Sequence, residues 1–316
     1  MSKKFLSVGM SFCDIPLRPA PANIMERDTA RIEPVEYHTG GDALTVAMVL
    51  SKMGENVSFV TNIGDDANGR FVRKELEKNG IGTEYVRTVK GYTTATSYQL
   101  IEENGQRHFL VDSGINSLQK SKDVPDAEIE KADIVFFGSA LAIEGMDDGE
   151  TADLFRRAHK MNKLTAMDAS VNDPGEIERK IDLLKDTLPL TDIFIPSYEE
   201  ASFLAEKTDV MEIMEVFSRF PFKVFGVKLG GDGCILTDDF KNYIRMEPFR
   251  SVKVVDTTGA GDCFMGGFLC SYMKGWPLAD CARFASAVAA FGISAVGPTT
   301  AVPDYQTVYR FMQENS

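Results

Sequence analysis

The stretch VVDTTGAGDCFMGGFLC, residues Val254–Cys270, places two threonines, two glycines and two aspartates in the seven residues DTTGAGD, directly before an amphipathic segment. In that segment apolar residues recur at the spacing of a helix, namely Phe264, Met265, Phe268, Leu269, Tyr272 and Met273. The spacing predicts a helix that starts at about Gly261. Because the first N–H groups of a helix are unpaired and glycine lets a ligand approach the backbone, this entry predicts an anion-binding site.

Asp262 falls in the first turn of that helix. The segment is not a Walker A loop, because GxxxxGK[ST] occurs nowhere and no lysine follows the glycines. A carboxylate beside an anion site repels a bound phosphate, but it is useful if it accepts a proton from a hydroxyl that attacks the phosphorus. The alternative is an acid that only complements the helix dipole. The complete string DTTGAGD favours the catalytic interpretation.

The composition predicts a soluble, cytoplasmic α/β protein. The chain has 316 residues, of which 44% are hydrophobic, so a large core is expected. Its formal net charge of −13 provides no field that would attract nucleic acid or an anionic membrane, so a phosphate must be held by local groups. The five cysteines lack metal-ligand spacing and are expected to be reduced and partly buried. No signal-peptide core and no run of about 18 apolar residues is present.

Short apolar runs alternate with segments of helical period, which predicts a mainly parallel sheet built from βαβ units. Helices are expected over residues 42–53 and 66–79, and the last third of the chain is expected to be helical. The expected strands are residues 5–10, 57–64, 133–138, 164–168, 192–197, 222–230, 233–238 and 242–248.

Two stretches, about residues 15–39 and 92–112, alternate polar and apolar residues in a different way. The four residues ENGQ, 103–106, predict a hairpin turn in the second stretch. Both stretches look like half-exposed strands of a small separate sheet that forms a lid over a cleft. Arg107 on this lid could reach a substrate, or it could be a solvated charge on a strand. We expect residues 1–316 to form one domain with this lid.

Four segments carry a resemblance to a known family. DTTGAGDCFMGGF resembles the C-terminal signature of the ribokinase-like (PfkB) carbohydrate kinases, and GGDALTVAMVLSKMGENVSFVTNIGDDANGRFV resembles their N-terminal signature. VGMSFCD resembles the first strand of the family, and ARFASAVAAFGISAVGPTTAVPD resembles its nucleotide-side helix and closing loop. The resemblance covers nearly the whole chain. It implies a three-layer α/β/α fold with a small β-sheet lid, and the activity of an ATP-dependent sugar kinase.

The resemblance also assigns residues to catalysis and sugar binding. Asp262 resembles the catalytic base, and the anion hole would be formed by Gly259, Ala260 and Gly261. Asp14 resembles the acid that binds sugar hydroxyls, and the pair Gly40 and Gly41 would let the sugar lie against the backbone. Further sugar-side positions are Asp42, Thr45 and Asn116. Ribokinases proper have lysine and asparagine where this chain has Asp42 and Thr45, which weakens the case for ribose. A loop cap is an equally good interpretation of Asn116.

The nucleotide and metal positions follow in the same way. IPSYEE resembles the N-x-x-E element that organises Mg²⁺ and its waters, with Glu200 as the acid and Ser197 in place of the asparagine. Alternatively, acids at this point simply start a helix. KLGGDG resembles the nucleotide turn. The residues implied to bind nucleotide there and on a later helix are Lys228, Gly230, Gly233 and Ser286. Asp256 and Thr258, with backbone near Gly297, resemble the monovalent-cation site of some members, so K⁺ is an expected further cofactor.

The expected function is therefore transfer of the γ-phosphate of ATP to a primary hydroxyl of a small carbohydrate, with Mg²⁺ present and Asp262 as the base. A homodimer that pairs through the lid is expected, with no nucleic acid or membrane partner. One alternative is a nucleoside kinase of the same family, in which Phe12, Tyr98 or Phe109 would contact the base. Another is a homologue that binds sugar or nucleotide without turnover. A dinucleotide-dependent dehydrogenase is excluded because no GxGxxG follows the first strand.

Overall fold

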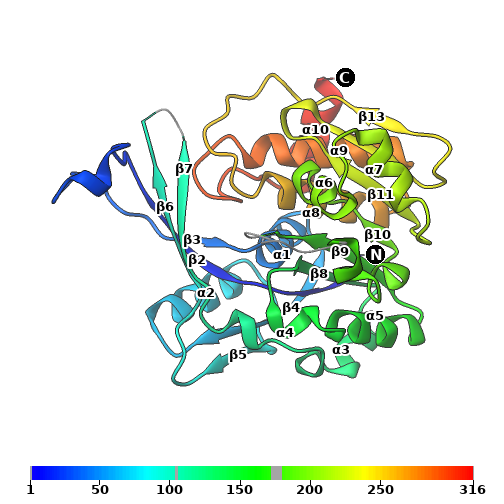
Figure 1. Cartoon of the computed structure of the whole chain (residues 1–316), viewed down its shortest axis with the longest axis horizontal. Helices are drawn as coiled ribbons and strands as arrows, with labels where there is room; N and C mark the ends of the chain where they lie inside the picture. Colours follow the sequence, from blue (N-terminus) through cyan, green and yellow to red (C-terminus); the bar gives the residue numbers. More distant parts are fainter. Residues whose placement is uncertain (1, 104–105, 172–179, 316) are drawn as a thin grey trace.

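The computed structural model describes residues 2–103, 106–171 and 180–315, and within them nine strands form one large sheet (Figure 1). The sheet has the order β13-β12-β11-β10-β9-β8-β1-β4-β5. Its strands are β1 (Lys4–Val8), β4 (Asn56–Gly64), β5 (Val86–Val89), β8 (Ile134–Ala140), β9 (Leu164–Ala169), β10 (Ile193–Phe194), β11 (Val224–Lys228), β12 (Cys234–Thr237) and β13 (Ile244–Met246).

All neighbouring strands from β5 to β11 are parallel, and β12 and β13 continue the sheet in antiparallel fashion. The chain leaves β1 for β4 on one side and later fills the other side with β8 and the strands that follow. The strand order therefore reverses between β1 and β8. In open α/β sheets, ligands bind at such a reversal, outside the carboxyl ends of the strands.

Helices cover both faces of the large sheet, and alternating strand residues fill two separate cores. In β1, Phe5 packs into one core and Leu6 into the other; in β8, Phe136 and Phe137 divide in the same way. The first core is covered by α1 (Asp42–Lys52), α2 (Ala67–Lys78), α8 (Ala260–Met273), α9 (Leu278–Gly292) and α10 (Tyr305–Glu314). The second core is covered by α3 (Asp126–Lys131), α4 (Glu144–Asp147), α5 (Glu150–Lys160), α6 (Tyr198–Ala205) and α7 (Val210–Phe217). The predicted α/β/α arrangement of three layers is thus observed.

A second sheet, which we call the small sheet, has the order β3-β2-β6-β7. Its strands are β2 (Phe12–Leu17), β3 (His38–Gly40), β6 (Thr96–Ile101) and β7 (Arg107–Asp112). They come from the two stretches in which the sequence predicted a separate sheet, and Figure 1 shows β6 and β7 extending on one side of the molecule. Two residues of the predicted turn ENGQ, 104 and 105, lie outside the described residues.

The interval between β2 and β3 differs from the prediction of half-exposed strands. It contains a short 3₁₀ helix, Ile24–Glu26, and otherwise no strand among residues 18–37. Three prolines lie here, at Pro19, Pro21 and Pro34. Because proline has no N–H group to donate to a neighbouring strand, polar–apolar alternation alone could not make this interval part of the sheet.

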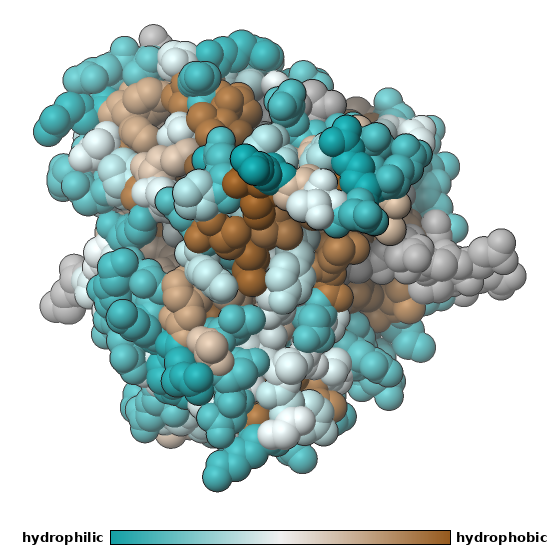
Figure 2. All heavy atoms as spheres, turned by 90° about the vertical axis from the view of Figure 1, so that its left-hand side faces the viewer, coloured by the Kyte–Doolittle hydropathy of each residue, from teal (hydrophilic) through white to brown (hydrophobic). Residues whose placement is uncertain are grey.

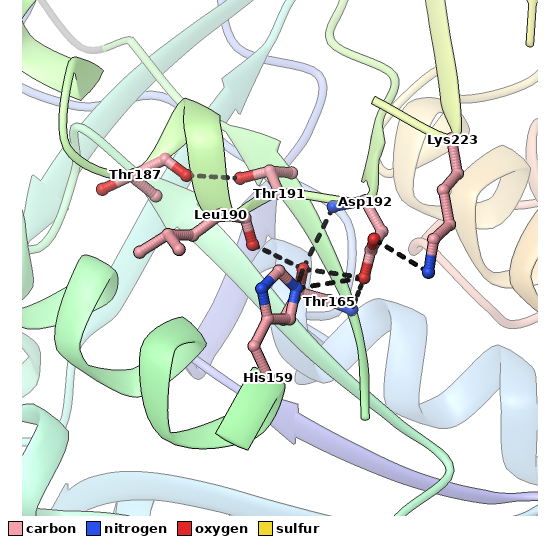
Figure 3. A network of polar contacts seen from close by, with 7 residues as sticks. All are labelled: His159, Thr165, Thr187, Leu190, Thr191, Asp192 and Lys223. Carbon is pink, nitrogen blue, oxygen red and sulfur yellow. Dashed lines mark hydrogen bonds and ion pairs between the residues drawn. The ribbon is translucent and has the colours of Figure 1, made fainter. Parts of the chain in front are cut away.

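A polar network ties three parallel strands together at their amino ends (Figure 3). Asp192 directly precedes β10, and one of its carboxylate oxygens accepts hydrogen bonds from the backbone N–H of Thr165 at 2.9 Å and from His159 Nε2 at 3.2 Å. Its other oxygen pairs with Lys223 Nζ at 3.0 Å. Since Thr165 lies on β9 and Lys223 directly precedes β11, one carboxylate aligns the starts of three strands.

Two general features complete the fold. All five cysteines are free and buried. None of the helices in the described part of the chain combines the length and the apolar character that crossing a membrane would require.

Candidate active site

A cavity of about 510 Å³ lies at the carboxyl ends of the large sheet, where residues of the small sheet also line it. The small sheet contributes Phe12, Asp14, Ser97, Gln99, Phe109 and Val111. Within the described residues, the charged side chains that line it are Asp14, Asp42, Asp168, Glu199, Glu200, Lys228 and Asp262. Lys228 is the only base in that set. The cavity therefore joins the sugar-side and nucleotide-side positions that the sequence predicted, and it is strongly acidic.

The entry to α8 has the geometry that the glycines of DTTGAGD predict. The helix starts at Ala260, one residue before the predicted start, and Gly259 precedes it with a φ of +71°. A Cβ at this position would lie 2.5 Å from a side-chain atom of Pro298. Gly259 is thus required twice, by its left-handed backbone and by the close approach of the closing loop.

Asp262 lies in the first turn of α8 and lines the cavity. Burial, and then the negative charge of Asp42, raise its pKa well above the ordinary value of an aspartate. A carboxylate with a raised pKa is a stronger base than an exposed one, and proton transfer is most effective when the pKa of the base is near the working pH. The environment of Asp262 therefore suits a general base.

Lys228, at the end of β11, lies beside Asp262 and the anion-binding entry of α8. Its Nζ is 2.5 Å from Asp168 Oδ2, and it would be 3.1 Å from a Cβ placed on Gly261. Burial alone would lower the pKa of Lys228, but the carboxylates of Asp168 and Glu200 outweigh it and raise the pKa. A charged ammonium therefore lies where a phosphate at the helix entry would bind.

Sequence reasoning missed Asp168 as a functional candidate. It is the fifth residue of the run LTAMD, which predicted only a buried strand. The signal was available, because a buried acid at the carboxyl end of a parallel strand faces the edge where ligands bind.

The sugar-side acids Asp14 and Asp42 reach the cavity from different elements. Asp14 lies on β2, and burial, followed by the nearby charge of Asp256, raises its pKa to about 7. A Cβ at Gly40 would overlap the Asp14 carboxyl group at 2.1 Å, so glycine is needed there. Asp42 starts α1 and accepts a 2.6 Å hydrogen bond from Ser139 Oγ, while its other carboxylate oxygen is buried without a hydrogen-bond partner. Burial raises the pKa of Asp42 to about 6.

The predicted site residues divide into those that line the cavity and those that do not. Among the described residues, the predicted positions that line the cavity are Asp14, Gly41, Asp42, Ser197, Glu200, Lys228, Gly230, Thr258, Gly261 and Asp262. Those outside the lining are Gly40, Thr45, Asn116, Gly233, Asp256, Gly259, Ala260 and Ser286. Thr45 Oγ1 and Asn116 Oδ1 are buried without a hydrogen-bond partner, whereas Asn116 Nδ2 donates to the Ser11 carbonyl at 3.3 Å.

Comparison with known proteins identifies the family. The model of a family described as pfkB family carbohydrate kinase matches residues 3–305. The chain belongs to this family. The predicted family and the predicted enzyme class, a carbohydrate kinase, are therefore confirmed.

Named relatives agree with that family. An ATP-dependent ribose-1-phosphate kinase of Halopiger xanaduensis is 28% identical over 98% of each chain. A probable fructokinase of Arabidopsis thaliana is 30% identical over 88% of this chain and 89% of its own length. Among solved structures, Arabidopsis thaliana ribokinase in complex with ribose and ATP has a TM-score of 0.82 and 23% identity, covering 99% of both chains. This last similarity confirms the ribokinase-like fold.

The residues of this kinase fit a magnesium ion bound mainly through the nucleotide. Glu200 and Ser197 form a capping box at the start of α6: Ser197 N donates to Glu200 Oε2 at 2.7 Å, and Glu200 N donates to Ser197 Oγ at 3.2 Å. Glu200 thus caps the start of a helix, as the alternative interpretation of the sequence predicted. It also lines the cavity near Lys228. No cluster of three or more ligating side chains occurs within the described ranges. Mg²⁺ does not need such a cluster, because it keeps several waters and binds one or two carboxylates together with phosphate groups of the nucleotide.

Arg107 contacts both of the residues that were predicted to bind a monovalent cation. Arg107, from β7 of the small sheet, donates to Asp256 Oδ1 at 3.2 Å and also hydrogen-bonds Thr258 Oγ1. Its second terminal nitrogen donates to Thr257 Oγ1 at 2.7 Å. The sequence left two interpretations of Arg107 open, a substrate ligand or a solvated charge on a strand. Neither predicted its contact with the segment DTT, residues 256–258.

Proposed function

We propose that this kinase transfers the γ-phosphate of ATP to a primary hydroxyl of a small, uncharged carbohydrate, with Asp262 as the general base. The main support is the position of Asp262, which lies in the first turn of α8 between the acidic sugar side of the cavity and the ammonium of Lys228. An acid there serves no purpose in phosphate binding alone. It is useful where a proton must leave a hydroxyl close to a bound phosphate.

The transfer follows from the roles of the residues around that carboxylate. The acceptor hydroxyl donates its proton to Asp262 while its oxygen attacks the γ-phosphorus in line, and ADP leaves. The N–H groups at the start of α8 and the Lys228 ammonium stabilise the charge on the transferred group. When bound, Mg²⁺ would supply further charge neutralisation on the phosphate oxygens, and Glu200 and Asp168 are the residues suited to hold it or its waters.

The proposal of an uncharged acceptor rests on the charges of the cavity. Asp14 and Asp42 line its sugar side, whereas Lys228, the one basic side chain among the described residues that line it, lies at the nucleotide end. Burying a sugar phosphate or sugar acid beside two carboxylates would be unfavourable, because like charges repel strongly when water is excluded. Of the two activities that the relatives' names suggest, phosphorylation of a neutral hexose such as fructose fits this cavity better than that of ribose 1-phosphate.

A nucleoside kinase is the second candidate function. Phe12 and Phe109 line the same cavity from β2 and β7. Aromatic faces at these positions could stack on a nucleobase, whose π-face binds such side chains without a sequence-specific contact. Nucleosides therefore belong in any test of the acceptor.

We also propose that the small sheet closes the cavity as a lid and pairs two copies of the chain. Its β7 residues Phe109 and Val111 line the cavity, so the alternate residue Leu110 points to the outer face. Leu110 and its cross-strand neighbour Tyr98 are 60% and 41% exposed. Figure 2, which views the molecule from the side of the small sheet, shows hydrophobic residues gathered on this face. A two-fold pair would cover the same apolar patch on both copies.

The decisive experiment measures ADP release with Mg·ATP against fructose, ribose, ribose 1-phosphate, 2-keto-3-deoxygluconate and adenosine. A neutral sugar is the expected substrate. With that sugar, Asp262→Asn should lower kcat by about 10²- to 10⁴-fold while ATP binding is retained. Asp280→Asn removes an exposed acid from the first turn of the next helix, α9, and is the matched control. A near-normal kcat in Asp262→Asn would remove this residue from the mechanism, and preferred turnover of an acidic sugar would contradict the proposed acceptor.

A further inference from the structure

Arg107 connects the small sheet to the segment DTTGAGD, two parts of the chain separated by about 150 residues. The guanidinium contacts three consecutive residues, Asp256, Thr257 and Thr258. It also lies 5.7 Å from the ring centroid of Phe109, two residues further along β7. A guanidinium that donates hydrogen bonds to several partners is held in one position. A charged side chain that extends from a strand into solvent is not held in this way.

The Asp256 carboxylate is already held by several donors. Its Oδ1 accepts from Thr258 N at 2.9 Å, from Thr258 Oγ1 at 2.7 Å and from Arg107 Nη1 at 3.2 Å, and its Oδ2 accepts from Gly297 N at 3.0 Å. Three of these donors, including the Arg107 guanidinium, share Oδ1, whereas Oδ2 accepts from Gly297 N alone. The Asp256 side chain is only 5% exposed. The guanidinium therefore occupies the space beside Oδ1 that a K⁺ ion bound to this oxygen would need.

The charge at Asp256 is also already balanced. The adjacent guanidinium of Arg107, which is always protonated, lies 3.2 Å from Asp256 Oδ1 and compensates the charge of this carboxylate. The predicted ligands Asp256 and Thr258 consequently do not fit a free monovalent cation.

We propose that the Arg107 guanidinium is a tethered replacement for the monovalent cation, so that this kinase needs no K⁺ and receives the charge from its own small sheet. This inference rests on the proposed kinase function only where its test measures kcat. Arg107 is a positioning residue here: by fixing Asp256, Thr257 and Thr258 it orders the segment that leads into Gly259 and the N–H groups of α8.

The proposal also links acceptor binding to the phosphate site. Phe109 and Val111 line the cavity from the same strand that begins with Arg107. A sugar that packs against these residues would favour the position of β7 in which the guanidinium reaches Asp256. Loss of the guanidinium should therefore lower kcat more than it raises KM for ATP.

The test compares the wild type and Arg107→Ala in K⁺ and in tetramethylammonium, a cation too large for a compact site. In the wild type, kcat and the melting temperature should be the same in both salts. In Arg107→Ala, kcat should fall about tenfold in tetramethylammonium, as expected for the loss of charge-assisted hydrogen bonds, and K⁺ should restore most of it. K⁺ should also raise the melting temperature of this variant, since an ion that binds the folded state alone stabilises it.

Two further variants provide controls. Arg18→Ala removes another arginine next to β2, which pairs with Glu33 at the surface, and should resemble the wild type in both salts. Arg107→Lys keeps a charge without the planar fork and should show a smaller response to K⁺ than Arg107→Ala. Stimulation of the wild type by K⁺, or a K⁺-dependent rise in its melting temperature, would overturn the proposal even if Arg107→Ala failed to fold. Loss of activity in Arg107→Ala that K⁺ does not restore would overturn it as well.

The melting-temperature measurements separate this inference from the proposed function. They need no turnover, so a chain that phosphorylates none of the tested acceptors still reports whether K⁺ binds when Arg107 is absent. Conversely, an active wild type that requires K⁺ would leave the kinase proposal intact and refute only the tethered cation.

Discussion

At the scale of single residues, the cavity is built from acids that are buried close to one another. Asp42 and Asp262 come from the starts of two different helices, α1 and α8, and the charge of Asp42 contributes to the raised pKa of Asp262. Asp42, at a position where the resemblance to ribokinases implies a lysine, therefore affects the proposed base as well as the proposed sugar side of the cavity. It makes the proposed base harder to ionise and more basic once ionised.

The pH dependence of kcat/KM tests this coupling. Asp262 must be deprotonated to accept a proton, so activity should rise with pH through its raised pKa. Asp42→Asn removes a negative neighbour, which lowers the pKa of Asp262, and the acid limb of the profile should move to lower pH. Kinetics measured from acidic to alkaline pH would detect the shift of the acid limb. An acid limb that stays in place or moves to higher pH would show that the two carboxylates are not coupled.

A glycine can be required because its backbone is left-handed or because a neighbouring atom leaves no room for a Cβ, and two substitutions distinguish these reasons. Gly54→Ala and Gly259→Ala both place a side chain on a left-handed residue, at φ +83° and φ +71°, but a Cβ meets nothing within 4 Å at Gly54. Gly54→Ala should therefore cost only the strain, about 1 kcal/mol of unfolding free energy. Gly259→Ala should cost more, because of Pro298, and should also lower kcat. Equal losses in denaturant unfolding would show that the loop simply moves away from Pro298.

At the scale of secondary-structure elements, two parallel strands of the large sheet, β9 and β11, are tied by a polar network at one end and contribute to the cavity at the other. The carboxyl ends of β9 and β11 provide Asp168 and Lys228 to the cavity. The amino ends of the same strands meet at Asp192, where the network of Figure 3 aligns them. This separation predicts that damage at the amino ends affects stability without affecting the chemistry.

Asp192→Ala tests that separation. It leaves the N–H of Thr165 and the ring of His159 without their acceptor, and it should lower the free energy of unfolding by about 2 kcal/mol. The kcat of the folded variant should remain within twofold of the wild type. Lys223→Met removes only a half-exposed partner of the same carboxylate and should cost less than about 1 kcal/mol. A large loss of kcat in Asp192→Ala would mean that strand alignment reaches the cavity.

At the scale of the whole molecule, the outer face of the small sheet decides the assembly that we propose. Leu110→Glu places a charge at the centre of the apolar face and should convert a dimer into monomers, as measured by sedimentation. Met25→Glu is the control, since Met25 is 94% exposed but lies outside the strands of the small sheet. A wild type that is monomeric at all concentrations would refute the pairing.

The large-scale fold could be predicted because its signals are local. Hydrophobic periodicity gave the βαβ alternation, and DTTGAGD placed Asp262 in the first turn of a helix. Partner choice over long distances could not be predicted: nothing near Arg107 indicates that it would contact Asp256 rather than solvent. Asp168 was missed because LTAMD was interpreted only as a buried strand, and the place of its acid at the carboxyl end of that strand was not used. The segment 18–37 was predicted wrongly as strand because alternation was given more weight than three prolines.

The burial of all five cysteines has a practical consequence. Burial raises the thiol pKa to about 12 at Cys13, Cys234 and Cys270, so these side chains are neither accessible nor ionised near neutral pH. Reactive thiolates need exposure and a low pKa. A cysteine introduced at an exposed site such as Leu110 would then be the one thiol that a maleimide dye modifies in the folded protein. Fluorescent reporters of small-sheet motion could thus be attached without first removing any natural cysteine.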